Sequence, residues 1–425
     1  MTGLSLSQAQ TAKLLAEFGP TGDSIAAITE QRRPIHTFYG GAHLFKPEIC
    51  AKLGKVALDL LKAYGPDPDT LADGLELREG YRPDQKTYDL VLGKLAKEPI
   101  EDYRIDFEDG FGSRSPEDED QAAISSAECL IQAAGKGILP PFCGLRIRAL
   151  GSDTRERALR TLDLFITKAV SSGGKLPDNF VVTLPKATSS KEIEVLVKAL
   201  DILEQTLKLN RSIGVELLIE TPRAIFGGDG RIAVSDLIEA GKGRVKSLHL
   251  GLYDLTSALG VSSQSQSLNH HICTFARTVM QFAAAGRGIN VVDSITNTIP
   301  APLHKEKDNG TPLSPQRIEE NRRAVFHGWK CSFSNIWRAL ESGIYQGWDI
   351  HPAQLPMRYL ATFIYFRRDL RESAARLAEF EKRSSQASLT GTIFDDQASI
   401  LGIRNYLNVA INCGATSSDE LSCLL

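Results

Sequence analysis

The sequence lacks the features that mark several protein classes. Its seven cysteines are odd in number and form no C-x-x-C pair, so reduced thiols are expected rather than a zinc site or a disulfide framework. It contains no run of about 18 apolar residues, so no membrane-spanning helix is expected. The N-terminal stretch MTGLSLSQAQTAKLLAEFG has no apolar core of the kind that secretory signals carry. These absences favour a cytoplasmic protein.

A strong charge of either sign is also missing. Lys and Arg number 49 and Asp and Glu number 52, for a formal net charge of −3. This balance gives no electrostatic basis for binding nucleic acid or an anionic membrane. Hydrophobic residues make up 42% of the chain and charged residues 24%, as in an ordinary globular protein. The 425 residues suffice for one large domain with additions, or for two ordinary domains.

What the sequence does contain is a regular alternation of short apolar segments with longer helical patterns. Several of the short segments are almost continuously apolar, which is typical of parallel strands buried on both faces. Ser115-Pro116 and a capping box from Ser189 to Glu192 mark two helix starts. Repeated eight times, this order predicts an α/β fold, a (β/α)8 TIM barrel. An open doubly wound sheet is disfavoured because no G-x-G-x-x-G follows the first strand. The expected strands are 34–39, 103–107, 144–149, 180–185, 214–220, 245–251, 289–293 and 345–351.

Three regions are expected along the chain. Residues 1–33 form an N-terminal helical extension, 34–358 form the barrel with a long insertion near 301–345, and 359–425 form a C-terminal helical subdomain or oligomer arm. The charged, Pro- and Gly-containing connection 301–320 is either a solvated surface loop or a lid over the barrel mouth.

Polar residues stand where the predicted strands end, and in such barrels the functional groups lie at the C-terminal ends of the strands. The third strand carries two arginines on one face, because they are two residues apart. Each residue alone has an ordinary explanation, such as a helix-capping acid or a satisfied histidine. Together they need a cation, since crowded carboxylates repel one another. The strand-end residues are Asp106, Glu108 and Asp109, then Arg146 and Arg148, Lys186, Glu220, Asp254, Asp293 and His351.

The residue types indicate the chemistry. Two carboxylates completed by water and substrate oxygens suit Mg²⁺, with Mn²⁺ as the second choice, better than zinc. An arginine supplies a planar fork for a substrate carboxylate.

Six segments resemble, in order, motifs of the citrate lyase β-subunit-like and HpcH-HpaI aldolase superfamily. The resemblance covers roughly residues 100–355 and implies a distant, enlarged member of these phosphoenolpyruvate/pyruvate-type barrels. It implies that Glu220 and Asp254 are the magnesium ligands, and that Arg146 holds the substrate carboxylate or carbonyl oxygen. It also implies that Asp106 and Glu108 contact metal-bound water or substrate. Lys186 matches a lysine of the family pattern, without a firm role. The segments are YRIDFEDGFGSRS, LRIRAL, VVTLPKATSSKEI, LLIETPRAI, LHLGLYDLTSALG and WDIHPAQL.

The sequence departs from the family pattern in places. Arg148 stands where the family has asparagine, which indicates either an extra anionic group on the substrate or a salt bridge to Asp106 or Glu108. The region that binds coenzyme A in the lyase members has no match, so the use of a coenzyme A ester as substrate stays open. Family habit implies a homo-oligomer, a trimer or a hexamer.

The expected function is that of a magnesium-dependent carbon–carbon lyase or aldolase acting on a keto acid or acyl-CoA through a metal-stabilised enolate. The proton acceptor stays open among Asp293, Glu108, His351 and a metal-bound water. A Schiff base on Lys186 is less favoured, because nearby carboxylates keep a lysine protonated. One alternative is phosphoryl transfer on phosphoenolpyruvate, although no G-x-x-x-x-G-K-[ST] occurs. The other is a non-catalytic barrel that binds a keto acid.

Overall fold

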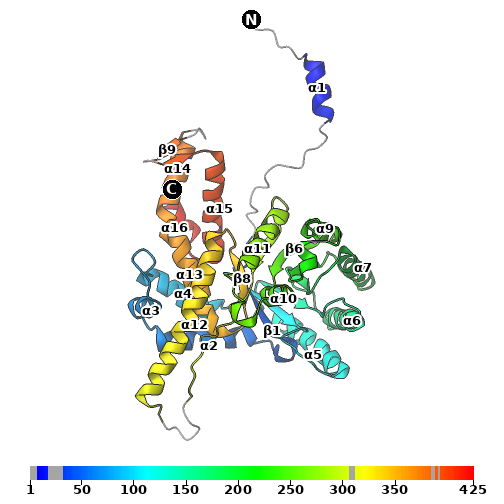
Figure 1. Ribbon diagram of the computed structural model, residues 1–425, viewed down its shortest axis with the longest axis horizontal. Coiled ribbons are helices and arrows are strands. Elements are labelled where there is room, and N and C mark those ends of the chain that lie inside the picture. Colours follow the sequence, from blue (N-terminus) through cyan, green and yellow to red (C-terminus); the bar gives the residue numbers. More distant parts are fainter. Residues whose placement is uncertain (1–6, 18–31, 306–311, 384–387, 391–392) are drawn as a thin grey trace.

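The computed structural model describes residues 7–17, 32–305, 312–383, 388–390 and 393–425 (Figure 1). Eight parallel strands form a closed barrel in which each strand pairs with its neighbour in sequence and β8 closes onto β1. The (β/α)8 TIM barrel predicted from the sequence is therefore confirmed. The strands are β1 His36–Gly41, β2 Asp102–Asp106, β3 Phe142–Arg146, β4 Phe180–Leu184, β5 Gly214–Ile219, β6 Val245–Leu250, β7 Asn290–Asp293 and β8 Gln346–Asp349.

Helices surround the barrel and carry the connections between its strands (Figure 1). Both predicted helix starts are confirmed: the Ser115 side chain accepts a hydrogen bond from the backbone N–H of Asp118 (3.1 Å), and Ser189 and Glu192 form a capping box. The α-helices are α1 Gln8–Glu17, α2 Ile49–Tyr64, α3 Pro68–Leu75, α4 Gln85–Lys97, α5 Pro116–Gly135, α6 Arg155–Ser171, α7 Ser190–Thr206, α8 Pro222–Ile225, α9 Val234–Ala240, α10 Leu252–Ala258, α11 His271–Ala284, α12 Pro315–Glu341, α13 Leu355–Arg368, α14 Leu370–Lys382, α15 Gln397–Cys413 and α16 Ser418–Ser422. The 3-10 turns are η1 Ala42–Leu44, η2 Ser263–Ser265 and η3 Pro352–Gln354.

The region near 301–345, expected as an insertion, is occupied mainly by one long helix. Helix α12 connects β7 to β8 and buries Val325, Trp329 and Ile336 along one side. Its first residues fall within the connection 301–320, so part of that connection is helical. Residues 306–311 lie outside the described residues.

The C-terminal region is helical, as predicted, and its helices take part in two hydrophobic clusters. Helix α13 belongs to the main core through residues such as Tyr359 and Phe363. Helices α14, α15 and α16 build a second cluster around Leu377, Ile403 and Leu421. A two-stranded antiparallel ribbon, β9 Ser388–Thr390 with β10 Ile393–Asp395, precedes α15. At the other end of the chain, α1 stands apart from the barrel and has no buried residue (Figure 1).

Charged residues occupy the barrel interior, a space that branched apolar side chains fill in most such barrels. Arg104 is fully buried, and its Nη2 contacts Asp102 Oδ2 at 2.7 Å and Glu216 Oε2 at 2.8 Å. Thr183 and Ser247 donate further hydrogen bonds to Glu216. Burial opposes ionisation of Glu216, but Arg104 outweighs it and keeps the pKa of that carboxyl below its usual value. A charged layer thus supports the strands from within.

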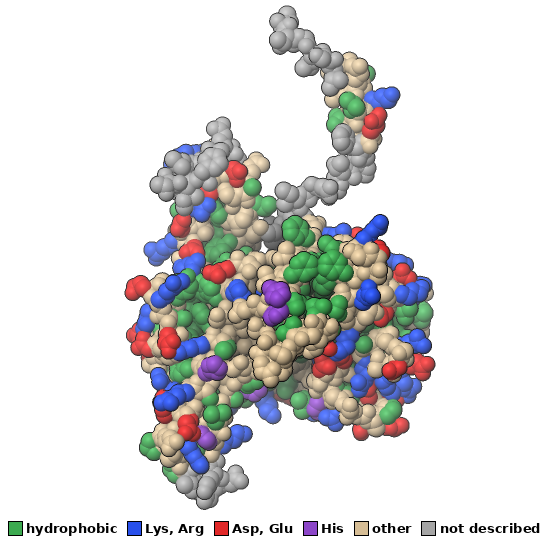
Figure 2. All heavy atoms as spheres, viewed as in Figure 1, with side chains coloured by type: hydrophobic (Ala, Val, Ile, Leu, Met, Phe, Trp, Pro, Cys, Tyr) green, Lys and Arg blue, Asp and Glu red, His purple; other side chains and the backbone are tan. Residues whose placement is uncertain are grey.

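The distribution of charged side chains on the outer surface agrees with the nearly equal numbers of acidic and basic residues in the sequence. Figure 2 shows basic and acidic side chains interspersed over α5 to α9, with no region of one sign on that face. A hydrophobic group lies over α11, where Phe282 is 82% exposed and Phe275 stacks on Phe226. Among the described residues, no helix combines the length and apolarity that a membrane crossing requires.

Candidate active site

A cavity of about 560 Å³ opens at the C-terminal ends of the barrel strands. Five residues from the predicted strand ends line it, namely Asp106, Asp109, Arg146, Glu220 and Asp254. They come from β2, β3, β5 and β6 or from the turns that follow these strands. Residues distant in sequence are brought to one rim, because parallel strands all end on the same side of a barrel.

Asp106 and Arg146 form the fixed base of this rim. The Nε and Nη2 atoms of Arg146 donate to the two carboxylate oxygens of Asp106 at 2.6 and 2.5 Å. Asp106 also accepts the backbone N–H groups of Glu108 (2.9 Å) and Gly110 (2.7 Å). A Cβ on Gly110 would lie 2.5 Å from Asp106 Oδ2, so a side chain there would displace the carboxylate. With its oxygens occupied in this way, Asp106 positions Arg146 and the turn after β2.

Glu108 connects the two cations of the site. One of its oxygens contacts Arg146 Nη1 at 3.0 Å, and the other accepts a short hydrogen bond from Lys186 Nζ. Burial raises the pKa of Glu108, and Asp109 adds to this, while Arg146 and Lys186 oppose it. Glu108 and Lys186 are not among the lining residues, but each contacts one that is: Glu108 lies 3.0 Å from Arg146 Nη1, and Lys186 Nζ lies 3.7 Å from Asp254 Oδ2. Their charges therefore act on the cavity from its immediate border.

Lys186 has a backbone conformation that serves the site. Its φ of 51° lies in the left-handed region, which is costly for a residue other than glycine. In this conformation its backbone N–H donates to Glu220 Oε1 at 2.7 Å, while its Nζ lies 3.7 Å from Asp254 Oδ2. Burial disfavours the charged lysine, but Glu108, Glu220 and Asp109 outweigh it and raise its pKa above the usual value. Lys186 is thus a fixed ammonium group, which is the wrong state for a Schiff-base nucleophile.

Glu220 is buried at the floor of the cavity and Asp254 is half-exposed beside it. Burial raises the pKa of Glu220 to about 7; Lys186 opposes this, and Asp254 and Glu108 add to it. Around the cavity, five carboxylates (Asp106, Glu108, Asp109, Glu220 and Asp254) face two cations, Arg146 and Lys186. The site therefore has an excess of negative charge that the side chains around it do not offset.

This donor set fits a hard divalent cation. Carboxylate oxygens are the ligands that Mg²⁺ prefers, and Mg²⁺ usually keeps several waters and takes only one or two carboxylates. In the part of the chain that the structure describes, no three His, Cys, Asp or Glu side chains form a complete metal cage. Glu220 and Asp254 would therefore hold such an ion together with water or substrate oxygens.

Five of the predicted site residues are not among those that line the cavity: Glu108 and Lys186, which contact residues that do, and Arg148, Asp293 and His351, which are engaged elsewhere. Arg148 turns outward and its Nε donates to the buried Glu119 of α5 at 2.8 Å, so its ion pair is not with Asp106 or Glu108. Asp293 is buried, and its Oδ1 lies 3.0 Å from Nη1 of Arg277 in α11. The His351 ring accepts a hydrogen bond from the backbone of the following 3-10 turn, and burial lowers its pKa.

Other cavity residues were not among the predicted site residues, although Trp348 begins the segment WDIHPAQL. Tyr39 of β1 lies under Arg146, whose guanidinium carbon is 4.9 Å from the ring centre. Trp348 of β8 lines the cavity and donates from Nε1 to Nδ1 of the buried His249 at 2.6 Å. One signal was present: two glycines end β1, and a Cβ on Gly41 would lie 2.2 Å from a backbone oxygen. Paired glycines at a strand end indicate such a close approach.

The chain matches, over residues 23–424, a family described as a domain of unknown function, DUF6986. The chain belongs to this family. No curated protein matches its sequence.

Among solved structures, a citrate lyase from Burkholderia xenovorans LB400 is similar, with a TM-score of 0.59 and 17% identity over 93% of this chain and 97% of that chain. At this identity the likeness establishes the fold. The citrate lyase-type barrel expected from the sequence motifs is confirmed to that extent.

Two further structures are similar at lower scores. The protein CitE from Mycobacterium tuberculosis, in complex with magnesium, acetoacetate and coenzyme A, has a TM-score of 0.49 and 15% identity over 91% of this chain and all of that one. A malate synthase from Haloferax volcanii, in a ternary complex with pyruvate and acetyl-CoA, has a TM-score of 0.49 and 12% identity over 88% of this chain and 90% of that one.

Proposed function

We propose that this protein is a magnesium-dependent enzyme that makes or breaks a carbon–carbon bond next to the carbonyl of a keto acid or an acyl-CoA. The observation that carries the proposal is the excess of carboxylates in one cavity, with Glu220 and Asp254 beside the fixed cations Arg146 and Lys186. A metal ion offsets this charge and at the same time presents a Lewis acid to the substrate. The fold likeness to a citrate lyase is in keeping with this activity without establishing it.

Glu220 and Asp254 would hold the ion. When bound, it supplies Lewis acidity that stabilises negative charge developing on a carbonyl oxygen. The ionised form of Glu220 is the one that binds a cation, and its high pKa means that metal binding competes with a proton near pH 7.

Arg146 orients the substrate. Its bidentate bond to Asp106 fixes the plane of the guanidinium, and its position over the Tyr39 ring holds that plane against the cavity wall. A positively charged group fixed in this way binds the carboxylate of a keto acid in one orientation. Leu44, Ile49 and Trp348 add apolar surface to the lining of the cavity.

In the cleavage direction, a base must remove the proton from the hydroxyl group of the substrate whose carbon–carbon bond breaks. Of the three side chains considered for this role, Glu108 is the one grouped with Arg146 and Lys186 at the cavity border. Its pKa is raised by burial, which brings a carboxylate closer to the range in which it accepts protons at neutral pH. We therefore assign the proton transfer to Glu108. Glu108→Gln is expected to lower kcat by about 10²–10⁴-fold and to leave oxalate binding in place.

The experiment that tests the proposal is calorimetric titration of oxalate, a stable analogue of the pyruvate enolate, with and without Mg²⁺. Binding is expected to require Mg²⁺. In Glu220→Gln and Asp254→Asn it is expected to weaken by more than the roughly 10–100-fold that loss of an outer-shell partner costs. The exposed Asp153→Asn is the matched control and should bind as the parent does.

The activity is then sought by mass spectrometry in a panel of hydroxy-keto acids and acyl-CoA esters, which also decides between the two substrate classes. Oxalate binding that does not depend on Mg²⁺, or that survives both substitutions, would overturn the metal site. Metal-dependent oxalate binding without turnover of any member of the panel would instead favour a keto-acid-binding barrel.

A further inference from the structure

The lining of the candidate active-site cavity changes character around the barrel. Its charged residues belong to or follow β2, β3, β5 and β6, whereas residues within 38–53 and 348–352 line it from β1, β8 and the segments after these two strands. Strands β8 and β1 are paired neighbours, and α2 lies against η3, so the two stretches adjoin. In the closed ring of eight strands, β1 stands opposite β5, the strand that Glu220 follows. We call the lining residues of these two stretches the β8–β1 sector.

The β8–β1 sector is apolar. Among the described residues that line the cavity there, none has a charged side chain, a carboxamide, or a Ser or Thr hydroxyl group. Leu44, Ile49 and Leu53 contribute aliphatic side chains, and the last two are four residues apart, so they share one face of α2. Leu44 is 57% exposed and Ile350 is 39% exposed. Apolar surface that stays exposed at a cavity indicates a ligand that covers it.

Two polar side-chain groups remain in the sector, the indole N–H of Trp348 and the phenol of Tyr39, and the fully buried His249 engages both. Trp348 Nε1 donates to His249 Nδ1 at 2.6 Å, and the phenol oxygen of Tyr39 lies 3.4 Å from the same nitrogen. Because an indole N–H can only donate, Nδ1 accepts and the ring proton is on Nε2. Nε2 then donates to Ser247 Oγ at 2.9 Å, and Ser247 donates to Glu216 Oε1 at 2.8 Å. With their polar groups bound in this way, the two rings present carbon atoms to the cavity.

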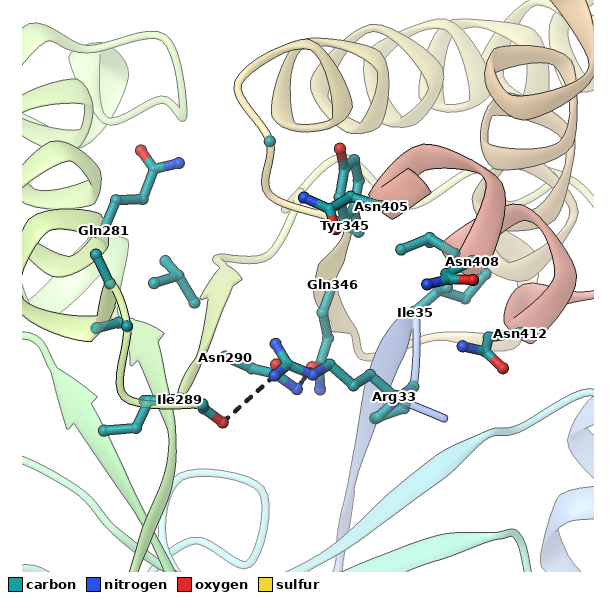
Figure 3. Close-up of a pocket in the computed structure, with 18 residues that line it drawn as sticks. Arg33, Ile35, Gln281, Ile289, Asn290, Tyr345, Gln346, Asn405, Asn408 and Asn412 are labelled. Atoms are coloured by element: carbon teal, nitrogen blue, oxygen red, sulfur yellow. Dashed lines mark hydrogen bonds between the residues drawn. The ribbon is translucent and has the colours of Figure 1, made fainter. Parts of the chain in front are cut away.

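A cavity of about 350 Å³ near the beginnings of β7 and β8 has the opposite kind of lining. The carboxamides of Asn290, Gln346, Asn405, Asn408 and Asn412 line it (Figure 3). Carboxamides both donate and accept hydrogen bonds, so they can replace the water around the hydroxyl groups of a ligand. The β8–β1 sector offers no such replacement. A chain of hydroxyl groups placed there would lose its hydrogen bonds to water, which costs free energy.

The sector adjoins a residue that is proposed to hold the keto-acid end of the substrate. The centre of the Tyr39 ring lies 4.5 Å from that of Trp348 and 4.9 Å from the guanidinium carbon of Arg146. A carboxylate bound to Arg146 is therefore close to the apolar surface. The cavity volume of about 560 Å³ falls within the range of about 300–1,000 Å³ that is usual for small-molecule sites, and a three-carbon keto acid fills only part of it.

We propose that the substrate is a keto acid whose chain ends in an apolar group, either an aliphatic chain or an aromatic ring, and not in a row of hydroxyl groups. The inference rests on the proposed function, because it takes Arg146 and the metal ion to hold the keto-acid end. The apolar end then covers Ile49, Leu53 and Trp348. Each methylene group buried in this way strengthens binding by roughly fourfold.

The test is calorimetric titration of the full chain, in the presence of Mg²⁺, with oxamate and two of its derivatives. Oxamate is a stable analogue of pyruvate and reports on the keto-acid end alone. N-propyloxamate adds an apolar chain, and N-(2,3-dihydroxypropyl)oxamate adds a chain of the same length with two hydroxyl groups. The main variant is Ile49→Asn combined with Leu53→Asn, and the matched control is Val56→Asn, at an exposed position of the same helix that does not line the cavity. Leu44→Asn is a second variant, which replaces a side chain that is already more than half exposed and so puts folding at little risk. A thermal melt checks that each variant folds.

N-propyloxamate is expected to bind the parent at least about tenfold more tightly than oxamate or the dihydroxypropyl derivative does. This preference should fall at least about threefold in the cavity variants and stay unchanged in Val56→Asn, while the affinity for oxamate stays within about twofold throughout. Equal or tighter binding of the dihydroxypropyl derivative by the parent would overturn the inference, and so would a propyl preference that persists in every folded cavity variant. In both cases oxamate still binds, so the metal site stands and only this inference fails. If oxamate itself does not bind with Mg²⁺, the proposed function fails and this inference fails with it.

Discussion

Replacing Glu220 by glutamine is expected to stabilise the metal-free protein at alkaline pH while it abolishes metal binding. Glu220 is buried among other carboxylates, and its pKa is raised from 4.5 to about 7. Glutamine keeps an oxygen that can accept the backbone N–H of Lys186, a bond of 2.7 Å in the parent. The substitution thus removes the charge and preserves the shape and the principal hydrogen bond.

The magnitude follows from linkage between protonation and folding. A carboxyl with a higher pKa in the folded chain than in the unfolded chain binds its proton more tightly when folded. This tighter proton binding adds to the free energy of unfolding. The added stability is complete below about pH 4.5 and is lost as the pH rises through about 7. A shift of this size corresponds to about 3 kcal/mol at pH 8. Glu220→Gln does not ionise, so it should be more stable than the parent by about 3 kcal/mol at pH 8 and by less than about 1 kcal/mol at pH 5.

The assay is urea unfolding in EDTA at pH 5 and at pH 8, with the exposed Glu79→Gln as the matched control. A second series adds Mg²⁺, which should raise the free energy of unfolding of the parent and not that of Glu220→Gln. Equal pH dependence in the parent and in Glu220→Gln would refute the reasoning, because the raised pKa could then not arise from Glu220. A Glu220→Gln variant that is less stable than the parent at pH 8 would refute it as well.

Four further predictions concern Arg104, Lys186 and Arg148. Arg104→Met leaves two buried carboxylates without their partner and should lower the free energy of unfolding, measured in urea, by about 3–5 kcal/mol. The exposed Arg160→Met is the control and should lower it by less than about 1 kcal/mol. An equally small loss for Arg104→Met would contradict the role of the charged layer. Lys186→Met removes a positive charge beside the cavity carboxylates and should tighten Mg²⁺ binding in calorimetry. The parent should also show no mass increase after borohydride treatment with pyruvate, and a trapped adduct on Lys186 would instead establish a Schiff base. Arg148→Gln should bind oxalate with an affinity within about twofold of the parent's. It should lower the free energy of unfolding by about 1–3 kcal/mol, because the buried Glu119 loses a partner. A large loss of oxalate affinity would place Arg148 in the site after all.

The amino-acid sequence by itself determined the barrel and much of the candidate site. The alternation of short apolar runs with helical patterns is a local signal, and a closed parallel barrel is the arrangement that buries both faces of such strands. The site followed from one geometric rule, that parallel strands end on the same side. This rule placed Arg146, Glu220 and Asp254 around one cavity, although 108 positions separate the first from the last.

The tertiary structure alone decided where side chains beyond the strand ends point. Arg148 lies two residues past the end of β3, where strand alternation no longer fixes direction, and the buried Glu119 of α5 draws it outward. Asp293 is held by Arg277, a helix residue that no motif distinguished. Residues 405–412 of α15 line one cavity together with Ile35, which precedes β1, although more than 300 residues separate the two segments. Such contacts depend on how whole elements pack, and packing is set by the sum of many weak interactions that no short segment of sequence contains.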